Sequence, residues 1–157
     1  MNKWMERAIE LALENVAQGG QPFGAVLVKE DEIIGEGVNE LHIRPDSTGH
    51  AELLALRRAQ QKLKSTDLRG AVMYASGAPC PMCFGAMAMA SVDKAYYANS
   101  LEEAISVGLT CSSEVYADLQ KSETERVFQM IHMPVENEEM SPMHVWHKKG
   151  NKVWQLR

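Results

Sequence analysis

Two short groups of residues constrain this chain more than any other feature. The first is His-Ala-Glu at residues 50–52, and the second is Pro-Cys-Pro-Met-Cys at residues 79–83. Two cysteines three positions apart at the start of a helix bring their sulfurs to one side, where the helix dipole favours thiolates. We therefore expect a fold that brings two helix starts together, so that His50, Cys80 and Cys83 surround one metal ion.

The apolar periodicity predicts an alternation of helices and strands. Helices are expected at residues 4–16, 51–63, 81–90, 101–106 and 114–119 and from Pro142 onward, and strands at 25–29, 33–38, 72–76, 94–98 and 127–133. The first two strands form a hairpin, whereas the next two flank a helix and should pair in parallel. This order predicts an α/β fold, a three-layer α/β/α sandwich around a five-stranded mixed sheet.

Composition narrows the class of protein. The chain has 157 residues and a formal net charge of −5, which favours a small-molecule substrate over a nucleic-acid backbone. We found no linker or repeat, and we expect one domain over residues 1–157.

No apolar run reaches the roughly 18 residues of a membrane span, and the N-terminus resembles no signal peptide, so we expect a cytoplasmic protein without a membrane partner. Three cysteines indicate metal or redox use rather than a disulfide framework.

The three candidate ligands predict hydrolysis. Three protein ligands leave a fourth tetrahedral position for a water, whose pKa a zinc ion lowers to about 7. Glu52 is the nearest carboxylate in the sequence and would carry protons between that water and a leaving amine. Positions two apart in a regular helix point in nearly opposite directions, so His50 and Glu52 must reach the site from either side of the helix start.

Other interpretations of the cysteine pair stay open at this point. A CxxC pair also occurs in thioredoxin-type redox sites and as half of a four-ligand structural zinc site. A non-catalytic, zinc-stabilised binding module is a further alternative. The presence of Glu52 and the absence of a fourth ligand favour a catalytic site.

The two motifs resemble those of the cytidine and deoxycytidylate deaminase superfamily. Residues 20–29 (GQPFGAVLVK) and 141–146 (SPMHVW) are also similar to bacterial guanine deaminase-like nucleobase deaminases. The resemblance implies a cytidine deaminase-like fold and a hydrolase of purine metabolism that acts on C–N bonds of cyclic amidines, with guanine or a related aminated heterocycle as substrate. It implies that His50, Cys80 and Cys83 bind Zn²⁺ and that Glu52 shuttles protons. It also implies that Phe23, Asn39 and Ala51 bind the substrate.

The resemblance also implies a homodimer. Residues 134–157 would be exchanged between subunits, with Trp146 and Trp154 closing the partner's pocket. A tRNA adenosine deaminase, which acts on a flipped base, shares both motifs and is the main alternative. Residues 110–113 lack the aspartates of many guanine deaminases, so the substrate stays open among guanine, guanosine, another aminated heterocycle and tRNA adenosine.

Overall fold

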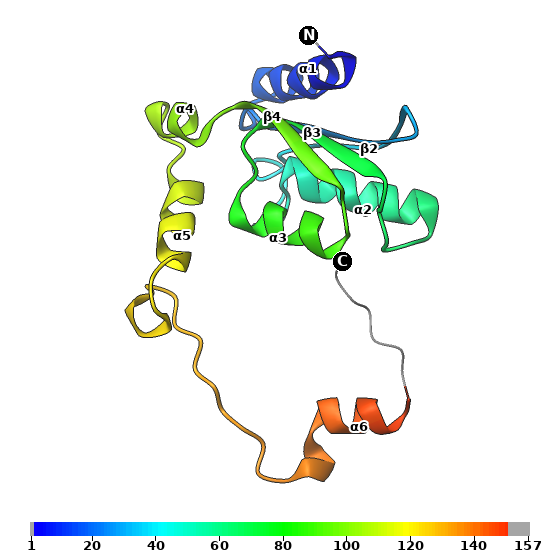
Figure 1. Ribbon diagram of the computed structural model, residues 1–157. Helices are drawn as coiled ribbons and strands as arrows, with labels where there is room; N and C mark the ends of the chain where they lie inside the picture. Colours follow the sequence, from blue (N-terminus) through cyan, green and yellow to red (C-terminus); the bar gives the residue numbers. More distant parts are fainter. Residues whose placement is uncertain (1, 151–157) are drawn as a thin grey trace. The chain divides into compact units, whose positions relative to one another are not determined.

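The computed structural model describes residues 2–150 (Figure 1). They divide into two units, with the boundary between Ala117 and Asp118. The single domain expected from the sequence stays a prediction. The helices and strands of the chain as far as α5 are α1 (Lys3–Ala17), β1 (Gly24–Lys29), β2 (Glu32–Val38), α2 (Ala51–Leu63), β3 (Ala71–Gly77), α3 (Pro81–Met89), β4 (Lys94–Asn99), α4 (Leu101–Ser106) and α5 (Cys111–Leu119).

The first unit is built on a mixed sheet with the strand order β2-β1-β3-β4. β1 pairs antiparallel with both β2 and β3, whereas β3 and β4 are parallel, as a strand-helix-strand unit requires. The β1–β2 turn uses Glu30 and Asp31, both with positive φ, in place of the usual glycine. The hairpin and the parallel pair predicted from the sequence are confirmed.

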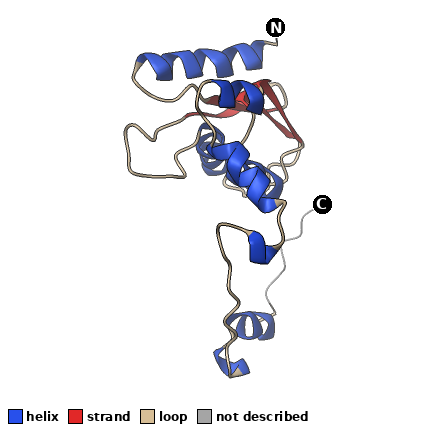
Figure 2. Ribbon diagram, turned by 90° about the vertical axis from the view of Figure 1, so that its left-hand side faces the viewer, coloured by secondary structure: helices blue, strands red, loops and turns tan. Residues whose placement is uncertain are grey.

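Helices cover both faces of this sheet, which confirms the three-layer class (Figure 2). On one face, Val26 and Val28 pack with Ala8 and Leu11 of α1. On the other, alternate residues of the same strand join a larger core with residues of α2 and α3. Because side chains alternate along a strand, one run of apolar residues in β1 supplies both cores.

A close approach between β2 and α2 fixes the start of α2. A Cβ on Gly37 would lie 2.1 Å from the carbonyl oxygen of Ala51, so only glycine allows the strand to come this near to the first helical turn. Leu53, Ala55 and Leu56 of α2 are buried in the core. The position of the first turn of α2 is therefore set by packing on the sheet, and this turn follows His50 directly.

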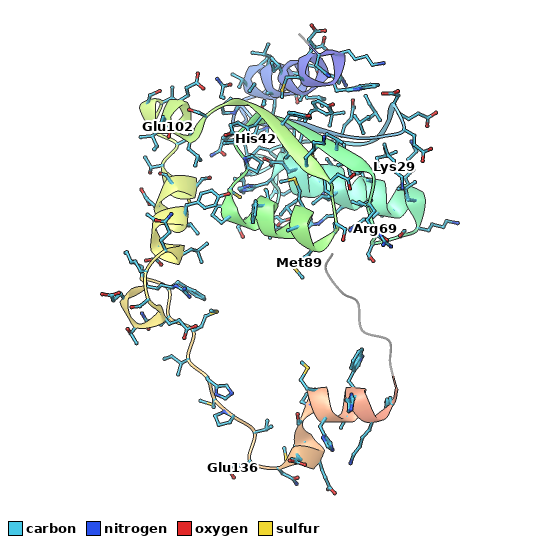
Figure 3. All side chains as sticks on the ribbon, viewed as in Figure 1. Lys29, His42, Arg69, Met89, Glu102 and Glu136 are labelled. Carbon is cyan, nitrogen blue, oxygen red and sulfur yellow. The ribbon has the colours of Figure 1, made fainter. Side chains whose placement is uncertain are left out.

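The predicted fifth strand is wrong: the sheet has four strands among the described residues, and residues 127–133 form neither helix nor strand (Figure 3). The apolar side chains of this segment are strongly exposed, with Val127 at 86%, Ile131 at 84% and Met133 at 88%. A strand needs a neighbouring strand for its backbone hydrogen bonds as well as an apolar pattern. Within the second unit no strand is described that could pair with these residues.

The regular secondary structure described in the second unit is helical. It contains the 3-10 turns η1 (Glu123–Glu125) and η2 (Glu138–Met140) and the helix α6 (Pro142–Lys148). Pro142 occupies the first turn of α6 and the Ser141 hydroxyl accepts the His144 N–H, which confirms the predicted helix start. Trp146 lies in α6, whereas Trp154 lies outside the described residues.

No helix in residues 2–150 combines the length and the apolar character that crossing a membrane requires.

Candidate metal centre and active site

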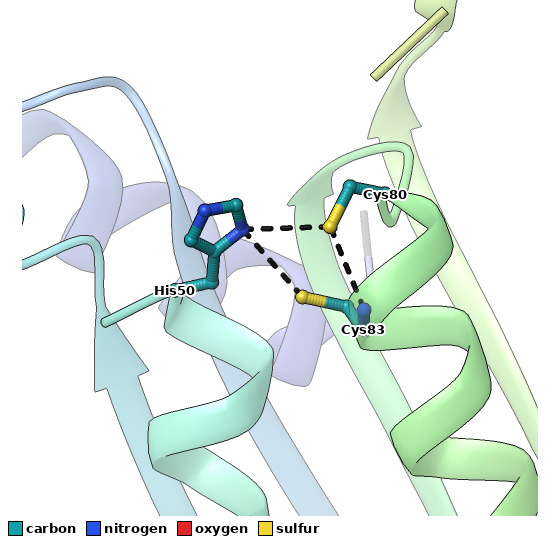
Figure 4. Close-up of side chains that lie close together, drawn as sticks. All are labelled: His50, Cys80 and Cys83. Carbon is teal, nitrogen blue, oxygen red and sulfur yellow. Dashed lines mark hydrogen bonds between the residues drawn. The ribbon is translucent and has the colours of Figure 1, made fainter. Parts of the chain in front are cut away.

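His50, Cys80 and Cys83 converge on one point (Figure 4). The His50 Nδ1 atom lies 3.5 Å from Cys80 Sγ and 3.7 Å from Cys83 Sγ, and one ligand atom from each residue lies within 4.8 Å of the other two. A tetrahedral zinc ion with bonds of about 2.3 Å to sulfur and about 2.05 Å to nitrogen would separate these atoms by about 3.6 Å. The donor set and its spacing therefore fit a zinc ion held by three protein ligands.

Two helix starts produce this convergence. His50 is the N-cap of α2 and Cys80 is the N-cap of α3, and both have extended backbone conformations. Pro81 begins α3, where its missing N–H is not needed, and the Cys83 N–H donates to Cys80 Sγ at 3.5 Å. The positive ends of both helix dipoles face the cluster and favour negatively charged sulfur.

Glu52 reaches the same cluster from inside the protein. Its side chain is 6% exposed, and the Cys83 thiol donates to Glu52 Oε2 at 3.4 Å. His50 lies outside the helix at φ −85° and ψ 149°, so the opposition expected of residues two apart in a helix does not apply. The helix start thus presents an imidazole and a carboxyl group to one point.

The pKa values of these groups shift in different directions, and that of Cys80 moves toward the deprotonated form that a metal ligand needs. The pKa of Cys80 is lowered to about 4, mainly by contact with the Cys83 side chain and to a smaller extent by contact with His50. The pKa of Cys83 is raised by the same contact and by burial, so negative charge concentrates on Cys80. The hydrogen bond with Cys80 raises the pKa of His50, and burial raises that of Glu52. A raised pKa makes a carboxyl group hold a proton more readily, as a group that passes protons from water to a substrate must do.

A cavity of about 960 Å³ opens beside the cluster. His50, Cys80 and Phe23 are among the residues that line it. Residues of α4 and the start of α5 complete the wall, including Thr110, Cys111, Ser112 and Val115. The size is within the range of small-molecule sites, and the cavity gives a ligand direct access to His50 and Cys80, two of the three candidate metal ligands.

The three predicted substrate-binding residues are placed differently. Phe23 lines the cavity, and Ala51 is buried in the first turn of α2, where backbone N–H groups have no partner within the helix. Asn39 is also buried and is not among the lining residues. Its amide donates to Gln21 Oε1 at 3.1 Å and accepts the Leu41 N–H at 3.1 Å. The substrate contacts of all three residues stay predictions.

Two residues near the site had no signal in the sequence. Gln21 lines the cavity and accepts the hydrogen bond from Asn39. Tyr116 donates from its hydroxyl to the Pro79 carbonyl oxygen at 2.9 Å, across 37 positions of sequence. Burial is the largest cause of the raised pKa of Tyr116, followed by charges at Cys80 and Cys83, so its hydroxyl stays protonated. Neither contact follows from local periodicity.

Comparison with known proteins agrees with this geometry. Residues 1–99 match the family described as "Cytidine and deoxycytidylate deaminase zinc-binding region". The chain belongs to this family. The match contains both groups of candidate ligands and the sheet that positions them, and the family implies a hydrolase acting on C–N bonds of cyclic amidines.

The relatives cover the chain to different extents. The guanine deaminase of Bacillus subtilis is 37% identical over 150 residues, 95% of each chain. The crystal structure of a Bacillus subtilis guanine deaminase covers 99% of this chain and all of its own, with a TM-score of 0.89 at 36% identity. A tRNA-specific adenosine deaminase of Buchnera aphidicola is 35% identical, but over 64% of this chain and 66% of its own. The chain is therefore a homologue of guanine deaminase over nearly its full length.

Proposed function

We propose that this deaminase uses zinc to release ammonia from guanine or a closely related aminated purine. The observation that carries the proposal is that a buried carboxyl group, Glu52, lies against the His50, Cys80 and Cys83 cluster beside a cavity of about 960 Å³. A soft imidazole and thiolate donor set favours zinc over magnesium or calcium. When bound, zinc would act as a Lewis acid that activates water at neutral pH.

The chain's own residues would hold the metal and move the protons. His50, Cys80 and Cys83 are the proposed ligands. Glu52 would take one proton from the attacking water and deliver it to a ring nitrogen. It would then take the second proton from the newly added hydroxyl group and deliver it to the amine, which leaves as ammonia while the carbonyl forms. Phe23, on the cavity wall, would contact the face of the heterocycle. Ala51, through its N–H, and Asn39 are the other proposed contacts of the base.

Guanine is favoured over tRNA adenosine by the extent of the similarity. The guanine deaminase relative matches 95% of the chain, whereas the tRNA-specific relative matches 64%. The chain also carries a formal net charge of −5, which does not favour attraction to a phosphate backbone. We therefore propose a free base rather than a nucleotide in RNA as the substrate, and a cytoplasmic enzyme of purine metabolism.

An ammonia-release assay on the purified, zinc-containing protein tests this function. The panel is guanine, guanosine, adenine, cytosine, cytidine, an amino-triazine, an amino-pterin and a tRNA anticodon stem-loop. We expect ammonia from guanine at a rate above that from every other compound. Ammonia from the stem-loop alone would identify a tRNA adenosine deaminase. Ammonia from none of them, with one zinc ion per chain, would indicate a non-catalytic binding module.

We also propose that two copies of the chain form a homodimer in which residues 134–157 are exchanged and Trp146 and Trp154 close the partner's pocket. The support is the exposed apolar segment at residues 127–133, which precedes the proposed exchanged region. Phe128 is 75% exposed and Ile131 is 84% exposed in the single chain. Exposed apolar side chains in such a run are typical of a surface that another chain covers.

Light scattering tests the dimer. The intact chain should have twice its monomer mass of 17.5 kDa, and Ile131→Lys should shift the population toward the monomer because it places a charge in the proposed interface. Leu13→Lys is the matched control, since Leu13 is 64% exposed on α1 and should keep the dimer mass. A monomeric mass for the unchanged chain would refute the dimer.

A further inference from the structure

α5 contributes part of the cavity wall although no residue of the helix is buried. Cys111, Ser112 and Val115 of this helix line the cavity, as does Thr110 immediately before it. A helix without buried residues is not held in place by core packing. Its position must therefore depend on specific contacts.

One hydrogen bond ties α5 to the cysteine-bearing segment. The Tyr116 hydroxyl donates to the Pro79 carbonyl oxygen at 2.9 Å, and Pro79 directly precedes Cys80. Ser112 and Tyr116 are four positions apart and so share one face of the helix. The face that lines the cavity is therefore also the face that carries the tyrosine contact.

The other described hydrogen bonds of α5 are local. The Ser113 hydroxyl donates to the Thr110 carbonyl at 2.7 Å, and the Glu114 N–H donates to the same oxygen. At the other end of the helix, Asp118 accepts the Val127 N–H. Within residues 2–150, the bond from Tyr116 is thus the described hydrogen bond that links this helix to α3 and the cluster at its start.

We propose that Tyr116 is a positioning residue, which holds the wall formed by residues 110–115 at a fixed distance from the start of α3 and thereby sets the width of the substrate cavity. The inference rests on the proposed function in that the substrate occupies this cavity. The tyrosine acts through the wall that it positions and takes no part in proton transfer. Loss of its hydroxyl would loosen substrate binding and leave the chemical step intact.

Tyr116→Phe in the full-length zinc protein tests the inference, because it removes the hydroxyl and keeps the ring. Hydrogen exchange measured by mass spectrometry, without substrate, should show residues 110–119 exchanging about threefold to tenfold faster than in the unchanged protein. In the ammonia assay with guanine, KM should rise by about the same factor while kcat changes less than twofold. Zinc content should not change.

Tyr74→Phe is the control, since Tyr74 lies in β3 and packs on the face covered by α1. It should change neither the exchange of residues 110–119 nor KM.

Unchanged exchange of these residues in Tyr116→Phe would overturn the inference whether or not the protein deaminates guanine. Faster exchange with an unchanged KM for guanine would overturn the role in substrate binding, as would a loss of kcat without a change in KM. Absence of ammonia from the unchanged protein would refute the proposed function alone, and the exchange measurement would still decide whether Tyr116 holds the wall.

Discussion

Replacing Glu52 with glutamine is expected to lower kcat by about a thousandfold or more while zinc stays bound. Glutamine has nearly the shape of glutamate but can neither accept nor release a proton under the conditions of the reaction. The Glu52 carboxyl group lies 3.4 Å from Cys83 Sγ but is not one of the three proposed metal ligands. The change should therefore separate proton transfer from metal binding. Steady-state kinetics with guanine, together with elemental analysis of zinc, measures both.

Folding stability gives this prediction a second readout. Burial raises the pKa of Glu52 because it disfavours the ionised carboxylate, and a neutral amide carries no such penalty. The unfolding temperature of Glu52→Gln should thus equal or exceed that of the unchanged protein. Glu10→Gln, on the exposed face of α1, is the matched control and should keep kcat within twofold. Near-normal turnover by Glu52→Gln would remove this carboxyl group from the mechanism.

The position of the candidate site could be predicted from the sequence because its parts lie at helix starts, which carry strong local signals. The apolar spacing after His50 and the proline after Cys80 each identify a helix N-terminus, and α2 and α3 begin at Ala51 and Pro81 as predicted. Parallel pairing of β3 and β4 then follows from the strand-helix-strand order. What the motif alone left open was how His50 and Glu52 reach one point, and the extended backbone of the N-cap supplies the answer.

The wrong strand prediction at residues 127–133 shows that an apolar pattern alone is not sufficient to predict a strand. The pattern indicates that side chains such as Phe128 and Ile131 need an apolar environment. It does not indicate whether the same chain or another chain supplies that environment. In the described residues these side chains are exposed, and no ladder forms. The proposed dimer would provide the missing surface, so the same residues that gave a wrong strand prediction support the dimer.

The contacts of Tyr116 and Gln21 were beyond sequence reasoning for a different reason. Each is a single hydrogen bond between segments that the chain brings together only once it has folded. Tyrosine and glutamine are common polar residues, and neither has a spacing that links it to the ligands. Packing of the core determines where the helices lie, whereas such individual contacts determine the fine geometry of the cavity.

Replacement of Cys83 by alanine is expected to abolish both metal binding and activity. Cys83 is fully buried, and its sulfur lies 3.7 Å from His50 Nδ1, so the variant loses one of the three proposed ligands from inside the cluster. Two remaining protein ligands bind zinc far more weakly than three. Zinc per chain after gel filtration should fall from about one to below about a tenth, and ammonia release from guanine should fall below detection. Added zinc should raise the unfolding temperature of the unchanged protein and leave that of the variant unchanged, because only the intact site favours the folded state.

Cys111→Ala separates loss of a ligand from loss of a thiol. Cys111 is exposed at the start of α5 and does not belong to the His50, Cys80 and Cys83 cluster. This variant should therefore retain about one zinc ion per chain, held by the same three ligands as in the unchanged protein. The small loss of side-chain volume in Cys83→Ala, about 1 kcal/mol of packing, should leave the chain folded, which circular dichroism verifies. If folded Cys83→Ala still carried one zinc ion per chain, the ion would be held elsewhere, and the two helix starts would have to be assigned a purely structural role.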